Sequence, residues 1–152
     1  MSFLDNKLCS SDTNTKDMFT ILNTRLTTKD NNKKWLNATI PYVISDTFSS
    51  DSRQLILNAI NSFHNKTCVK FVLKQPQDTD YVLITSGQGC SSPVGRQGKG
   101  QNVTLGDGCL QLHTIIHELM HSIGFFHEHQ RYDRDIYIDI HRENIKRDVL
   151  CF

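Results

Sequence analysis

The chain has 152 residues, which is enough for one domain with its own hydrophobic core. Its formal net charge is +1 and its basic residues do not cluster beyond Lys33-Lys34, so the charge pattern indicates neither nucleic-acid binding nor membrane-surface binding. No apolar run approaches the ~18 residues of a membrane span, and the first residues lack the apolar region of a signal peptide.

The N-terminal part of the chain is expected to be loosely ordered. Residues 1 to about 34 are rich in Ser, Thr, Asn, Asp and Lys, and only residues 18–22 are apolar. Such a segment buries too little apolar surface to offset the entropy lost when its backbone is ordered. We therefore expect a leader with at most one short helical turn.

Four short stretches carry the alternating or β-branched pattern of strands, at residues 39–45, 69–73, 80–85 and 101–105. Pro41 has no backbone N–H, which predicts that the first strand lies at a sheet edge or that Pro41 is at a strand start. Residues 86–100 contain five glycines and are expected to form a loop. They do not match a phosphate-binding fingerprint, because no helix follows directly.

A first helix is predicted between residue 51 and about residue 66. Ser49 or Ser50 can cap it by accepting an N–H of the first turn. Apolar residues at helical spacing predict a buried face made of Leu55, Ile56, Ala59, Ile60 and Phe63. His64 lies beside this face and is interpreted as a surface or packing residue.

A second helix is predicted to carry the chemistry. His117, Glu118 and His121 form H-E-x-x-H, in which the two His lie one helical turn apart on one face and can reach the same Zn²⁺. Gly124 can end the helix with a positive φ and so return His127 to the metal as a third ligand. Three neutral nitrogen ligands leave a position for water, as in catalytic zinc sites. Glu118, next to the first ligand, can act as a base.

A bare H-E-x-x-H also arises by chance, so the alternative is a helix that binds no metal. The Gly and the third His at the required offsets argue against it, as does the apolar run at residues 110–116, which can bury a helix. His129 and His141 do not have ligand spacing and are interpreted as surface residues. No C-x-x-C is present, which argues against a thiolate zinc site.

The full pattern H-E-x-x-H-x-x-G-x-x-H is the zinc signature of metzincin proteases. Residues 117–135, HELMHSIGFFHEHQRYDRD, closely resemble the astacin family of zinc endopeptidases, whose longer motif G-F-x-H-E-x-x-R-x-D-R-D is matched by residues 124–135. Upstream, the resemblance includes Trp35, residues 40–42, residues 67–71, Cys90, residues 94–96 and Cys109. It covers roughly residues 33–145.

The resemblance implies an α+β fold of the metzincin N-terminal type. Its core would be a twisted, mostly parallel sheet of four or five strands, with a backing helix and an active-site zinc helix. The chain would divide into a leader at residues 1–25, in the place of the family's inhibitory propeptide, and an astacin-like catalytic domain at residues 26–152. The leader lacks the family's F-x-G-D motif, whose Asp occupies the zinc, so the mechanism of latency is open.

The implied function is that of a zinc-dependent endopeptidase with one Zn²⁺ per chain, held by His117, His121 and His127. A zinc-bound water would attack the peptide carbonyl, with Glu118 as general base and then as acid to the leaving amine. The partner is a protein or peptide substrate. It is expected to pair with the strand at residues 101–105, with Gln101, Val103 and Leu105 as the substrate-binding residues.

Family members cut the leader and bury the new amino terminus against the Glu that follows the third zinc ligand. For this chain the resemblance implies a cut between Arg25 and Leu26 and a structural role for Glu128, alongside that of Gly124. Cys9, in the leader, could bind zinc as a thiolate but is interpreted as an unpaired residue.

The cysteines and sequons bear on the cellular compartment. The resemblance implies a disulfide between Cys90 and Cys109, and Cys68 could pair with Cys151. Three N-glycosylation sequons begin at Asn37, Asn65 and Asn102, although an Asn-rich chain also produces sequons by chance. With the family resemblance they favour a secreted protein, despite the missing signal peptide.

Family catalytic domains continue past the point that matches residue 145, through a Met-containing turn and a Tyr that can stabilise the oxyanion. Here no Met follows Met120, and Tyr132 and Tyr137 are too close to the motif to match that Tyr. The sequence therefore indicates a truncated product and supports two rival hypotheses: an inactive zinc-binding half-domain, and a fragment that does not fold stably. It predicts weak or undetectable proteolysis from this chain.

Overall fold

The computed structural model describes residues 27–145 of the chain. The elements, with η for a short 3₁₀ helix, are η2 (Asn31–Lys33), η3 (Leu36–Ala38), β1 (Thr39–Ile44), α2 (Ser50–Lys66), β2 (Lys70–Leu73), β3 (Tyr81–Thr85), β4 (Cys90–Ser91), β5 (Gly100–Leu105), α3 (Leu112–Ile123), η4 (Glu128–Gln130), η5 (Arg134–Ile136) and η6 (Arg142–Asn144). Within residues 27–145, no helix is both long and apolar enough to cross a membrane.

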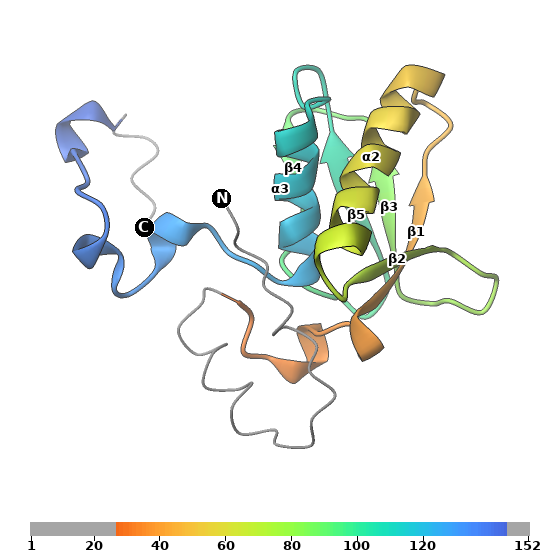
Figure 1. Cartoon of the computed structure of the whole chain (residues 1–152), viewed down its shortest axis with the longest axis horizontal. Helices are drawn as coiled ribbons and strands as arrows, with labels where there is room; N and C mark the ends of the chain where they lie inside the picture. Colours follow the sequence, from red (N-terminus) through yellow and green to blue (C-terminus); the bar gives the residue numbers. More distant parts are fainter. Residues whose placement is uncertain (1–26, 146–152) are drawn as a thin grey trace.

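One five-stranded sheet organises the fold, in the order β2-β1-β3-β5-β4 (Figure 1). Four strands are parallel, and the edge strand β4 runs antiparallel to β5. Helices α2 and α3 lie side by side on one face of the sheet (Figure 1). The fold is therefore α+β with a mostly parallel sheet, a backing helix and a motif-bearing helix, which confirms the prediction.

The hydrophobic core lies between the sheet and these two helices. Every second residue of β1, β3 and β5 is buried, because strand side chains alternate between the two faces of a sheet. The helices contribute Ile56, Ala59, Ile60 and Phe63 from α2 and Ile115 and Leu119 from α3. Each fully buried Ile or Leu stabilises the fold by about 1.5–3 kcal/mol, so this packing fixes the position of α3.

Helix α2 begins where its cap predicts. Ser49 is the N-cap, and its hydroxyl oxygen accepts the backbone N–H of Ser52 at 3.3 Å. Four of the five residues predicted for the apolar face are buried, whereas Leu55 is 36% exposed. Leu55 lies about 100° around the helix from Ile56, at the margin of the apolar stripe, and so lies at the rim of the core.

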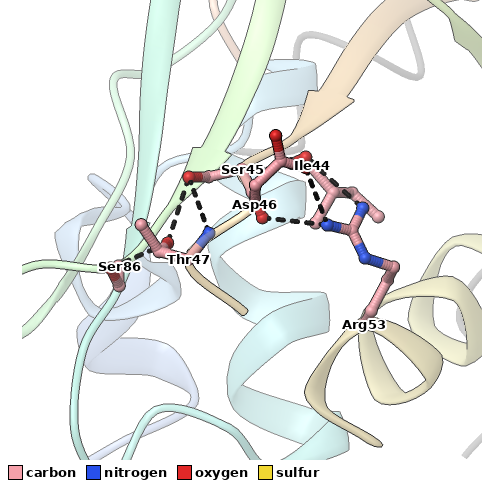
Figure 2. Close-up of polar contacts among 6 residues, drawn as sticks. All are labelled: Ile44, Ser45, Asp46, Thr47, Arg53 and Ser86. Carbon is pink, nitrogen blue, oxygen red and sulfur yellow. Dashed lines mark hydrogen bonds and ion pairs between the residues drawn. The ribbon is translucent and has the colours of Figure 1, made fainter. Parts of the chain in front are cut away.

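Polar contacts hold the start of α2 to the end of the neighbouring strands (Figure 2). Arg53 donates to the carbonyl oxygens of Ile44 and Ser45 at 3.4 and 3.1 Å. Thr47 donates its hydroxyl to Ser45 Oγ at 3.0 Å and accepts the hydroxyl of Ser86, also at 3.0 Å. These bonds join the loop after β1 to both α2 and the loop after β3.

Strand β1 lies inside the sheet, so the prediction that Pro41 marks an edge or a strand start is wrong. Pro41 pairs with Val72 of β2, and the pairing of β1 with β3 begins only at Tyr42. The missing N–H of Pro41 is therefore tolerated on the side where no strand is yet paired. The edge next to β1 is β2, and His64 of α2 accepts the backbone N–H of Phe71 there at 3.0 Å.

The predicted loop at residues 86–100 contains a strand that the sequence does not reveal. Strand β4 (Cys90–Ser91) pairs antiparallel with Leu105 and Thr104 of β5. Two residues are too few to show a hydrophobic period, and the surrounding glycines indicate only irregular structure. The short strand covers one end of β5 and becomes the edge of the sheet.

The expected disulfide between Cys90 and Cys109 is present, with a Cα–Cα distance of 5.7 Å. It joins the edge strand to the turn that precedes α3, where Cys109 is buried. Cys9 and Cys151 lie outside the described residues. The suggested pairing of Cys68 with Cys151 and the expected free state of Cys9 therefore stay predictions.

Candidate metal centre

Helix α3 places two of the predicted ligands together. His117 and His121 lie one turn apart, with ring centroids 4.6 Å apart and their Nε2 atoms at 3.0 Å. His121 is buried and His117 is exposed. The apolar side of the same helix packs through Ile115 and Leu119, so burial of that side turns the two imidazoles away from the core.

Gly124 ends α3 and reverses the chain. Its φ is +129°, and its N–H donates to the carbonyl oxygen of His121 at 2.9 Å. A Cβ at this position would lie 3.0 Å from Cγ2 of Thr28 on a backbone that side chains rarely adopt, so the turn requires glycine. The reversal brings Nε2 of His127 to 3.2 Å from that of His117 and 3.1 Å from that of His121.

The three Nε2 atoms form a nearly equilateral triangle with sides of 3.0–3.2 Å. Two nitrogen ligands about 2.0–2.1 Å from a tetrahedral Zn²⁺ lie roughly 3.3–3.4 Å apart, so the triangle is close to one face of a zinc coordination shell. A ring nitrogen is either a donor or an acceptor, so at least two of the three have the same role and cannot hydrogen-bond to each other. A shared cation satisfies all three, and these His could hold a metal.

The tautomer of His121 is set by a backbone carbonyl. Its Nδ1 lies 2.6 Å from the carbonyl oxygen of Phe125. Because a carbonyl only accepts, Nδ1 carries the proton, and Nε2 of the neutral ring keeps its lone pair for the other two His. A hydrogen bond from the second ring nitrogen is the usual way in which proteins orient a metal-binding imidazole.

The environment of His127 also favours a neutral ring. Its pKa lies below the usual histidine value, because partial desolvation and the neighbouring His121, His117 and His129 oppose protonation. Only the neutral imidazole binds a metal, so the lowered pKa extends the pH range in which His127 is available. His129 stacks on His127 at 5.3 Å between ring centroids but lies outside the cluster of three.

Glu118 lies on the same helix, directly after His117. It is only 5% exposed, and among the described residues its Oε2 atom has no hydrogen-bond partner. An unsatisfied buried acceptor costs about 1–3 kcal/mol, and more when charged, so such a group calls for an explanation. A water molecule lying between Oε2 and the three His would explain it, because Oε2 could accept a proton from that water.

Comparison with known proteins agrees with this geometry. A family model described as Astacin, a family of peptidases, matches residues 27–151. The chain belongs to the astacin family.

The relatives that this astacin resembles are themselves zinc proteases. Zinc metalloproteinase nas-8 from Steinernema carpocapsae is 49% identical over 117 residues, which are 77% of this chain and 28% of that protein. Zinc metalloproteinase nas-13 from Caenorhabditis elegans is 51% identical over 113 residues, which are 74% and 25% of the two chains. Among solved structures, high choriolytic enzyme 1, a hatching enzyme zinc-protease from Oryzias latipes (medaka fish), has a TM-score of 0.69 and 39% identity. The match covers 76% of this chain and 59% of that one, so the chain spans less than two thirds of the length of each relative.

In this astacin, two segments distant in sequence hold the last carbonyl groups of α3. The hydrogen bonds run from Trp35 Nε1 to the oxygen of Ser122 at 2.8 Å, from the N–H of Thr28 to Gly124 at 2.8 Å, and from the N–H of Gly95 to His121 at 2.9 Å. The last carbonyls of a helix have no partner within the helix, so these bonds satisfy them and fix the turn that returns His127. None of the three donors was predicted as a site residue; only the resemblance at Trp35 and residues 94–96 pointed to this region.

Trp35→Phe is therefore expected to loosen the metal centre. The substitution keeps an aromatic side chain but leaves the buried carbonyl of Ser122 without its donor, at a cost of about 1–3 kcal/mol. We expect a lower midpoint of thermal unfolding and zinc affinity reduced by up to the roughly 10–100-fold seen when a ligand loses its supporting contact. Thermal unfolding and competition with a chelator measure both. Tyr132→Phe, at an exposed aromatic residue, is the matched control, and equal behaviour of the two variants would contradict the role assigned to Trp35.

The predicted substrate-binding residues lie on β5 with buried side chains. Strand β5 lies between β3 and β4, and the side chains of Gln101, Val103 and Leu105 are at most 5% exposed and point into the core. The predicted peptide binding uses backbone hydrogen bonds of this strand, which side-chain burial does not test, so this role stays a prediction. Gln101 also orders the preceding loop, because its side chain accepts the N–H of Gln97 at 3.0 Å and donates to the carbonyl of Gly95 at 2.9 Å.

Glu128 follows the third His and is well exposed, at 74% of its side chain. It pairs with Arg131 at 2.6 Å, and Arg131 also donates two hydrogen bonds of 2.7 Å to Asp133. The latter bonds hold the pKa of Asp133 below its usual range and order the segment after His127. The expected partner of Glu128, an amino terminus at residue 26, lies outside the described residues, so that role stays a prediction.

Proposed function

We propose that this chain is the metal-binding, catalytic part of an astacin endopeptidase, with one Zn²⁺ held by His117, His121 and His127. The convergence of three Nε2 atoms within 3.2 Å of one another carries the proposal. A bound Zn²⁺ would act as a Lewis acid that polarises the peptide carbonyl and lowers the pKa of water to about 7.

Glu118 is the proposed general base. Its unpartnered Oε2 would take a proton from the attacking water and then return it to the leaving amine. Burial of the carboxylate supports this role, since little bulk water reaches Oε2 to compete for the proton transfer. His121, held by the carbonyl of Phe125, keeps its orientation while the charge at the site changes.

An extended protein or peptide segment is the proposed substrate, bound at the edge of the sheet beside α3. Strand β4 pairs with β5 on one side and, among residues 27–145, with no strand on the other. The backbone groups on this outer side can therefore pair with a substrate strand. The Cys90–Cys109 bond supports this role because it anchors β4 to the turn before α3.

A secretory route and a two-part chain complete the proposal. Residues 1–25 would form the leader and residues 26–152 the catalytic part. The Cys90–Cys109 disulfide supports secretion, because structural disulfides form mainly in oxidising compartments.

Metal removal tests this function. The purified chain, refolded with zinc, should contain one Zn²⁺ by metal analysis, and its cleavage of an unfolded protein should be weak or undetectable. Dialysis against a chelator should abolish any cleavage, and added zinc should restore it. A chain without stoichiometric zinc would refute the site, and a zinc-loaded chain without chelator-sensitive cleavage would favour the alternative, an inactive zinc-binding half-domain.

A further inference from the structure

One face of the sheet is left without a helix among the described residues. Helices α2 and α3 both pack on the opposite face (Figure 1). On the uncovered face, Val43 of β1 is the register partner of Leu83 of β3, and Leu83 is the partner of Asn102 of β5. Val43 and Leu83 are half-buried, whereas Asn102 is exposed. A short apolar row therefore ends at an exposed amide.

Asn102 begins one of the three sequons, Asn102-Val103-Thr104. The strand geometry separates its members: Val103 is fully buried in the core, while Asn102 and Thr104 lie on the uncovered face. Strand β4 reaches only Thr104 and Leu105, so β5 has no further strand partner at Asn102 on that side within residues 27–145. The acceptor Asn102 is exposed, and Thr104, half-buried against the loop at Gly87, lies on the same face of the strand.

We propose that Asn102 carries an N-linked glycan, which covers the apolar row on the face opposite the metal centre. The inference rests on the proposed secretory route and not on the proposed proteolytic activity. A glycan is bulky and solvated, so it belongs on a solvent-facing side of the sheet and can shield the half-buried apolar residues Val43 and Leu83 there.

The neighbouring residues give the first sugar a place to lie. Tyr81 is the register partner of Gly100, two residues before Asn102 on the same face. A Cβ on Gly100 would lie 2.7 Å from the Tyr81 ring, so the ring rests directly on the glycine backbone. Leu83, the half-buried register partner of Asn102, offers a surface on which the C–H face of a sugar can pack, whereas the Tyr81 ring is already approached by Lys74 Nζ at 4.9 Å from its centroid.

The same geometry keeps the glycan clear of the metal centre. Residues 101, 103 and 105 of β5 face the helices, and His117 and His121 lie on α3 on that side. A group attached to Asn102 points to the other side of the sheet, so it can remain in place during substrate binding.

The other two sequons provide matched comparisons. Asn37 lies in a turn with positive φ before β1, and Asn65 lies in the last turn of α2. Both are exposed. Replacing them leaves Asn102 as the sole acceptor.

The test uses the full chain, fused to a secretion signal and collected from the medium of eukaryotic cells, so that entry into the secretory pathway is imposed. In the variant Asn37→Gln/Asn65→Gln, treatment with an N-glycosidase should lower the mass in one step. When the N-glycosidase treatment is done in water enriched in heavy oxygen, residue 102 should become an Asp that carries the oxygen label. Adding Asn102→Gln or, separately, Thr104→Ala should abolish the mass step, while Thr104→Ser, which keeps the sequon, should retain it.

A secreted double variant without sugar on the peptide that contains residue 102 would overturn the proposal. A mass step that survives both Asn102→Gln and Thr104→Ala would overturn it as well, because the sugar would then be elsewhere. Since the signal is supplied, these results are independent of whether the native chain is secreted and of whether it cleaves peptides.

Discussion

Glu118→Gln is expected to lower the rate of peptide-bond hydrolysis by about 10²–10⁴-fold, which is the usual contribution of a positioned general base. Glutamine has nearly the same shape as glutamate but cannot take a proton from water. Glu118 is not one of the three residues whose nitrogens converge, so zinc content should stay at the wild-type level. Steady-state cleavage of a peptide substrate and metal analysis of the same preparation measure the two effects.

An exposed carboxylate provides the control for this substitution. Glu143 is exposed, pairs with His141 at 3.0 Å and is not part of the group of three convergent His. Glu143→Gln should therefore cleave at the wild-type rate. If Glu118→Gln retained more than about a tenth of the activity, the base would have to be another group. If it lost zinc together with activity, Glu118 would instead be holding the metal site together.

The features that the sequence predicts well are those encoded by near neighbours in the chain. The spacing of His117 and His121 is one helical turn, and a helix of that length imposes their proximity. Gly124 marks the reversal because no other residue adopts its backbone without strain. The alternation of β1, β3 and β5 is likewise local, and the structure places each of these strands within a residue or two of its predicted bounds.

The features that the sequence does not predict depend on partners distant in the chain. The position of Pro41 inside the sheet follows from where the pairing of β1 with β3 begins, which no local pattern encodes. The burial of Gln101 depends on the loop carbonyl that its amide binds. The hydrogen bond from Trp35 to Ser122 joins residues 87 positions apart, so only the folded chain reveals that Trp35 supports the helix that carries His117 and His121.

Each of the three His should prove necessary for metal binding, and their removal is the second large effect expected. His117→Ala or His127→Ala leaves two nitrogen ligands in place of three. Zinc affinity should fall by more than the roughly 10–100-fold that the loss of a ligand's supporting contact costs. The folded state should survive, since both side chains are exposed. Competition with a chromogenic chelator measures the affinity, and thermal unfolding without metal checks the fold.

His121→Ala is expected to do more, because His121 is buried and bonded to the carbonyl of Phe125 at 2.6 Å. Its loss removes a ligand and leaves that carbonyl without its side-chain donor, so both zinc affinity and the metal-free unfolding temperature should fall. His113→Ala is the matched control: His113 lies one turn before His117 on the same helix and is exposed, but it is outside the cluster. If the His113→Ala variant lost zinc, the three convergent nitrogens would not be the metal site. The same would follow if the His117→Ala or the His127→Ala variant kept its zinc. The same outcome would remove the basis for assigning Glu118 as the base, because its function depends on a metal held beside it by the same helix.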